Sequence, residues 1–239
     1  MECQSYTIDF AIAWTHTAIM LLAAYFAIFS TRQFYLKDHK KEIMKVKKTA
    51  FTWLTIGISS MALAYLLQTT AKSGGFYRTP GLADIFFVLS FATLAIGFDY
   101  FWYKTAKMHK LHIKEPIFIV GVVCGVFLWL YYLFVMAIIP NSAGQPIAVR
   151  ALHFFYPVIV SLIFIFTLVI HPRLKAGVIR TPLWYISNGV FAYFIGYMMF
   201  TYYRWTGAGQ YLTYMFSFLF LLSALYFLLG FYAAGKKYK

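Results

Sequence analysis

Residues 116–139 read PIFIVGVVCGVFLWLYYLFVMAII and contain no charged side chain. About 20 consecutive apolar residues are enough for a helix to cross the hydrocarbon core of a bilayer. Lipid offers no hydrogen-bond partner to the backbone, so a spanning segment must be a helix or part of a closed barrel. This run lacks the alternating pattern of a barrel strand and therefore predicts a transmembrane helix.

Six further runs of this kind flank it, each recognised by the disappearance of charged residues. Only the third run along the chain is interrupted by charges, at Asp84 and Asp99. The segments between the runs are short, and no internal repeat is visible. We expect an all-α fold with a single domain over residues 1–239, a bundle of seven transmembrane helices at about residues 10–31, 49–70, 82–103, 116–139, 151–171, 181–203 and 211–233.

The composition of the whole chain agrees with this interpretation. The 239 residues are 62% hydrophobic and 12% charged, whereas soluble domains are about 45–50% apolar and about 25% charged. These values exclude a soluble enzyme, a disordered chain and a DNA-binding domain. The two cysteines, Cys3 and Cys124, lie far apart in the sequence, so a disulfide framework is not expected.

Basic residues predict the orientation of the bundle. Most of the 21 lysines and arginines fall within residues 31–48, 104–115 and 171–181 and in the tail at 236–239, which all lie on one side. Basic loops remain in the cytoplasm, so we expect the N-terminus outside and the C-terminus in the cytoplasm. We assign the net charge of +14 to topology and to attraction for anionic lipid head groups, not to nucleic acid. The expected location is a prokaryotic cytoplasmic membrane.

Two carboxylates within the third run are candidates for function because charges inside a membrane are costly. Asp84 lies near the outer end of the run and Asp99 near its inner end, about 22 Å apart along a helix. Asp84 has Arg78 as a nearby basic partner. The simpler interpretation is that both are helix-end carboxylates. The alternative is a proton or ion path in a transporter or channel, formed by Asp84, Asp99 and Arg78.

Two histidines also fall within predicted spans, His16 in the first and His153 in the fifth, both in the outer half. Such a pair on different helices could ligate a b-type haem, although the expected depths differ by about one turn, roughly 5 Å. The simpler interpretation is that each imidazole hydrogen-bonds a neighbouring helix or a lipid head group. No metal-ligand spacing and no catalytic constellation is present, so no metal site, no catalytic residue and no enzyme activity is expected. The many Phe, Tyr and Leu side chains favour a packed interior without a cavity.

The seven-helix topology and three short strings resemble the microbial rhodopsins. Residues 17–27, TAIMLLAAYFA, resemble the first helix of haloarchaeal pumps. Arg78 followed by Ala83-Asp84 is similar to the family's Arg…Ala-Asp motif, with a longer spacing, and the resemblance implies a counterion role for Asp84. Residues 218–225, FLFLLSAL, resemble the family's Asp-x-Ser-Ala-Lys stretch.

The last string departs from the family at its two charged positions. Leu225 stands where the family has its retinal lysine, and Leu221 stands where it has an aspartate. No lysine occurs between residues 181 and 235, and a Schiff base needs an amine. Covalent retinal is therefore not expected. We expect no cofactor, and haem is the alternative left open.

Together these features predict a non-enzymatic membrane protein, rhodopsin-like without covalent retinal, that acts as a structural or regulatory subunit of a membrane complex. Its expected partners are the lipid bilayer and either other membrane subunits or further copies of itself. The alternatives are a transporter that uses Asp84 and Asp99, and an electron-transfer subunit that holds haem between His16 and His153.

Overall fold

The computed structural model describes residues 2–36, 42–76, 80–109, 116–170, 180–207 and 210–237. Nearly all of these residues are helical and none forms a strand, which confirms the predicted all-α fold. Arg78 lies outside the described residues, so its expected partnership with Asp84 is not addressed by the structure. The helices are α1 (Glu2–Leu36), α2 (Glu42–Ser73), α3 (Leu82–His109), α4 (Pro116–Tyr132), the π-helix η1 (Leu133–Ile138), α5 (Ile139–Asn141), α6 (Ile147–Ile170), α7 (Arg180–Thr206) and α8 (Gln210–Lys237).

Six helical segments of the described chain are long and apolar enough to cross a membrane. α7, expected to span at residues 181–203, is long enough but is not among them. It carries five tyrosines, two tryptophans and an asparagine, which lower its hydropathy. The six segments are Phe10–Tyr35, Lys48–Ser73, Leu82–Phe101, Ile119–Asn141, Ile147–Leu168 and Tyr211–Lys236.

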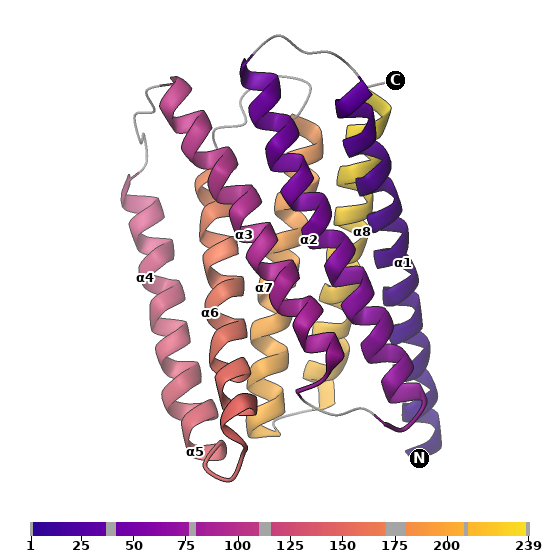
Figure 1. Ribbon diagram of the computed structural model, residues 1–239. Helices are drawn as coiled ribbons and strands as arrows, with labels where there is room; N and C mark the ends of the chain where they lie inside the picture. Colours follow the sequence, from indigo (N-terminus) through magenta and orange to yellow (C-terminus); the bar gives the residue numbers. More distant parts are fainter. Residues whose placement is uncertain are drawn as a thin grey trace.

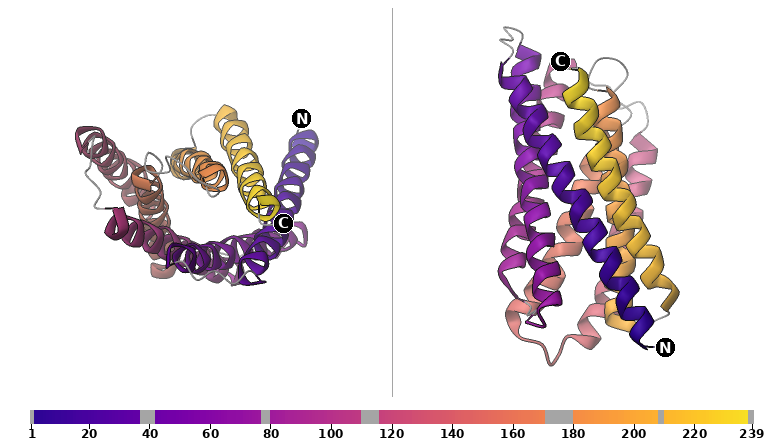
Figure 2. Two further views of the ribbon diagram at one scale, coloured as in Figure 1. Left: turned by 90° about the horizontal axis from the view of Figure 1, so that it is seen from above. Right: turned by 90° about the vertical axis from the view of Figure 1, so that its right-hand side faces the viewer.

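Six helices form a ring, and α4 lies outside it. In the order of their contacts the ring runs α1, α2, α3, α6, α7, α8 and back to α1. α4 packs against α6, and its continuation η1 contacts α6 and α7 (Figure 2). The N-terminus and the C-terminus lie at opposite ends of the bundle (Figure 1). This arrangement leaves a central space that side chains of all six ring helices can enter.

Glycines allow two pairs of ring helices to approach closely. A β-carbon at Gly230 of α8 would lie 2.6 Å from Cγ1 of Ile186 and 3.1 Å from the carbonyl oxygen of Pro182, both on α7. On the α2–α3 pair, a β-carbon at Gly57 would lie 2.6 Å from Cγ of Leu94. Small residues at such contacts let helix backbones meet, which is a main source of packing energy in a membrane.

The end of the bundle that holds the C-terminus is densely packed. Phe34 and Phe51 meet with ring centroids 5.1 Å apart, and Phe51 meets the edge of Phe231 at 6.2 Å. The hydroxyls of Thr31 and Thr55 hydrogen-bond at 2.7 Å between α1 and α2. This end of the bundle is therefore closed by apolar side chains.

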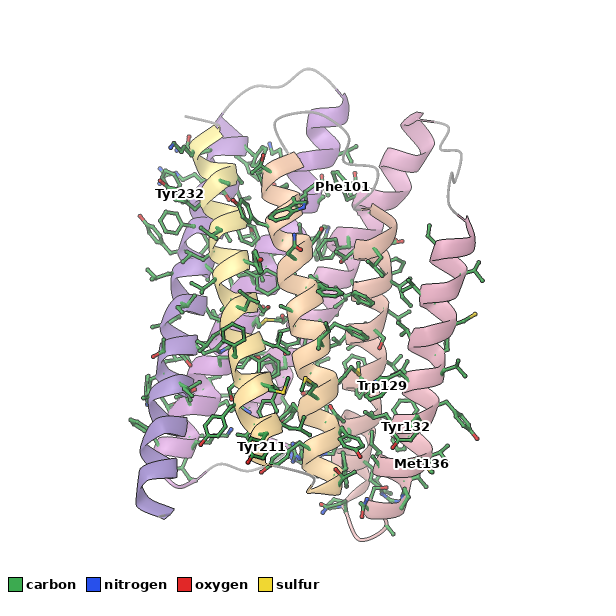
Figure 3. The ribbon with its side chains drawn as sticks, turned by 180° about the vertical axis from the view of Figure 1, so that it is seen from behind. Phe101, Trp129, Tyr132, Met136, Tyr211 and Tyr232 are labelled. Atoms are coloured by element: carbon green, nitrogen blue, oxygen red, sulfur yellow. The ribbon has the colours of Figure 1, made fainter. Side chains whose placement is uncertain are left out.

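Exposed aromatic side chains lie at both ends of the bundle (Figure 3). Tyr211 stands near one end of α8 and Tyr232 near the other, and both side chains are exposed. Trp129, Tyr132 and Met136 follow the peripheral α4–η1 segment and are also exposed. Tyrosine and tryptophan favour the two boundaries between membrane and water, so this distribution suits a bundle embedded in lipid.

Gly230→Ala is expected to destabilise the fold by about 1–3 kcal/mol, because the added methyl group would lie 2.6 Å from Cγ1 of Ile186 and 3.1 Å from the carbonyl oxygen of Pro182. The measurement is thermal or denaturant unfolding in mild detergent. Gly121→Ala on α4 is the matched control, since a β-carbon there meets nothing within 4 Å. Equal stability of the two variants would show that α7 and α8 do not meet at Gly230.

Candidate functional site: a pocket at one end of the ring

A pocket of about 710 Å³ opens inside the ring at the end that holds the N-terminus. All six ring helices contribute to its walls. The expectation of a packed interior is therefore wrong: the large side chains line the space without filling it. Sequence gives the volume of each side chain but not the separation of the helices that carry them.

Two aromatic side chains form the floor of the pocket. Phe91 of α3 and Tyr193 of α7 have centroids 5.8 Å apart. Beyond them a void of only about 10 Å³ remains among apolar side chains that include Leu94 and Phe227. The pocket therefore reaches inward from one end and does not continue as a channel through the bundle.

Aromatic side chains make up the walls above this floor. Tyr65 meets Phe87 edge-on at 5.0 Å, and its hydroxyl donates to the hydroxyl of Tyr193 at 3.2 Å. Tyr193 stacks on Tyr197 with an angle of 11° between the planes and contacts Phe220 at 5.2 Å. The wall thus presents flat apolar surfaces and a few hydroxyl groups.

Asp84 lines the outer part of the pocket and is held by hydrogen bonds from neutral donors. Its Oδ1 accepts from the hydroxyl of Tyr156 at 2.9 Å, and its Oδ2 accepts from the backbone N–H of Gly81 at 2.7 Å. Because Asp84 lies in the first turn of α3, this second bond is a carboxylate reaching back to the residue before the helix, as in a capping box. A carboxylate at a helix N-terminus is also stabilised by the helix dipole.

Asp99 lies elsewhere, on the exposed surface near the other end of α3. It is not among the residues that line the pocket. The structure therefore places one of the two predicted path residues at the pocket and separates the other from it by the packed half of the bundle.

The two predicted histidines line the same pocket from opposite sides of the ring, His16 on α1 and His153 on α6. His16 packs edge-on against Tyr65 at 4.2 Å and hydrogen-bonds the backbone of Phe220. His153 packs edge-on against Trp205 at 4.9 Å. His16 thus has the hydrogen bond to a neighbouring helix that the simpler interpretation expects, whereas His153 has an aromatic contact with α7. Both side chains also line the same pocket.

Two leucines were central to the rhodopsin comparison. The side chain of Leu225 is 42% exposed and lies on the outside of the bundle. Leu221 is half-buried, and neither residue lines the pocket. Position 225 therefore points away from the space in which a cofactor of the bundle would lie.

Sequence reasoning overlooked several lining residues, which it treated as packing or as loop charges. Tyr193 and Tyr197 were visible as a tyrosine pair four residues apart, which share one face of a helix. Lys72 and Arg204 were visible as isolated cations on the predicted outer side. The further tyrosines of the wall are Tyr65, Tyr156 and Tyr203.

Comparison with protein-family models, curated proteins and solved structures found no match for this chain. Within the described residues no group of three His, Cys, Asp or Glu side chains is arranged to hold a metal ion.

Tyr156→Phe is expected to lower the stability of the protein by about 1–3 kcal/mol, because a hydrogen bond to a partly buried carboxylate is lost. The measurement is unfolding in mild detergent, with Tyr232→Phe on the exposed face of α8 as the control. In an Asp84→Asn background the effect of Tyr156→Phe should shrink. An undiminished effect there would mean that the hydroxyl does not act through Asp84.

Proposed function

We propose that this chain is an integral membrane protein that crosses the bilayer seven times, with its N-terminus outside and its C-terminus in the cytoplasm. Termini at opposite ends of the bundle require an odd number of crossings (Figure 1). α7 lies in the ring between α6 and α8, and two of the tyrosines that lower its hydropathy, Tyr193 and Tyr197, face the pocket. The basic segments of the sequence support this orientation.

We further propose that the protein is non-enzymatic and binds a small organic molecule that enters the pocket from the outer side. The observation that carries this proposal is a space of about 710 Å³, walled by six helices and closed on the inner side. Ligand sites commonly measure about 300–1,000 Å³ and combine apolar walls with a few polar groups. Binding would bias how the six helices pack, which suits a sensor or regulatory subunit.

One observation supports each of two alternative functions, a carrier and a haem protein. Asp84 at a pocket that opens to one side alone suits a carrier in its outward-open state. His16 and His153 in a common aromatic space suit a b-type haem. A reduced-minus-oxidised visible spectrum of the purified protein tests the haem, and uptake into liposomes that is lost in Asp84→Asn tests the carrier.

Filling the pocket tests the binding function. Ala13 lines the pocket from α1, whereas Ala11 lies two residues away on the exposed face of the same helix. We expect small molecules that copurify with the protein, detected by mass spectrometry after mild extraction, to be lost in Ala13→Trp and retained in Ala11→Trp. Retention in both variants, with both folded, would rule out the pocket as their site.

Single cysteines test the orientation. In a background without Cys3 and Cys124, Phe76→Cys after α2 should react with a membrane-impermeant maleimide on intact cells. Lys236→Cys near the end of α8 should react only after the membrane is permeabilised. The reverse pattern would place the pocket on the cytoplasmic side.

A further inference from the structure

We infer that the ligand of this pocket is an amphiphilic organic anion, with a flat apolar body against the floor and a single anionic group at the mouth. This inference rests on the proposed binding function and names the chemical class of the ligand. It follows from how apolar and charged side chains are distributed along the depth of the pocket.

The inner part of the pocket selects for a flat apolar body. Phe91 and Tyr193 form its floor, and Phe87 and Phe220 continue the same aromatic surface on α3 and α8. Aromatic faces and edges bind planar rings or conjugated chains through offset and edge-to-face contacts. No lysine, arginine, aspartate or glutamate among the described lining residues lies at this depth.

The mouth of the pocket, by contrast, carries ionisable groups from four helices. These are Lys72 on α2, Asp84 on α3, His153 on α6 and Arg204 on α7. Lys72 and Arg204 are basic, and both are exposed at the opening.

Asp84 offsets only one of these two cations. Both of its carboxylate oxygens accept hydrogen bonds from neutral donors of the protein, one from Tyr156 and one from Gly81. These bonds hold the carboxylate in place without cancelling its charge. The mouth therefore keeps an excess of positive charge, with Arg204 exposed at the opening, and its electrostatic preference is for negative charge.

A further basic residue lies near this end of the bundle. Arg150 lies one turn before His153 on α6 but is not among the residues that line the pocket. It adds positive charge near the mouth without a direct contact to a ligand.

A matched set of probes tests the inference. The protein is placed in nanodiscs of zwitterionic phosphatidylcholine, so that the probe is the only organic anion. 1-Pyrenebutyrate, 1-pyrenebutanol and 1-pyrenebutylamine share one aromatic body and differ in the head group. Binding is followed by quenching of protein emission, and the pocket-filled Ala13→Trp variant supplies the background from lipid partitioning.

We expect the acid to bind about tenfold more tightly than the alcohol, the scale of one hydrogen bond to a charged group. Arg204→Gln should reduce this preference to about twofold, and its unfolding in mild detergent shows whether the variant is folded. Asp99→Asn, on the exposed surface away from the pocket, should leave all three affinities as they are.

The outcomes separate the two proposals. Equal binding of acid and alcohol, or tighter binding of the amine, would overturn the anion inference and leave the pocket as a binding site. Quenching by all three probes that does not exceed the Ala13→Trp background would overturn the proposed binding function itself.

Discussion

The close approach of α7 to α8 is the constraint on which the rest of the bundle depends. Gly230 lets the backbone of α8 rest against Pro182 and Ile186, and Gly189 admits the ring of Phe227 at 2.9 Å from where a β-carbon would stand. In a bilayer, where lipid and protein interior are equally apolar, such van der Waals contact is what holds helices together. The ring is tight where these contacts lie, and space for a pocket remains toward the other end.

α7 shows what sequence can and cannot predict in such a protein. Its length and lack of charge within residues 181–203 were enough to identify a helix. Its mean hydropathy is too low to count it among the six apolar spans. An average over the helix does not record which side chains point inward. Tyr193 and Tyr197 face an internal space, so their polarity is not exposed to lipid. Charge gaps therefore predicted the helices well, whereas the cavity depends on distances between helices far apart in sequence.

The ionisable residues also show what the sequence predicts and what only the structure reveals. Depth in the membrane was sufficient to single out Asp84, His16 and His153, and the structure gathers all three at one pocket. The structure also shows that Asp84 lies in the first turn of α3 and accepts a hydrogen bond from Tyr156. These two residues are 72 positions apart in the chain, so the sequence alone does not predict their contact. Asp99 interrupts the same apolar run of the sequence, but its side chain lies on the surface. An ionisable residue within an apolar run of sequence thus indicates a candidate site but does not indicate the role of that residue.

The position of α4 outside the ring has a consequence for how this protein tolerates mutation and divergence. α4 supplies no residue to the pocket, and Gly121 and Gly125 meet nothing within 4 Å. Substitutions along its outward face meet few side chains of this molecule, whereas substitutions on the ring helices must preserve contacts with the helices on either side. Among homologues, the sequence of α4 would therefore vary most, and the sequences of α7 and α8 would be the most conserved.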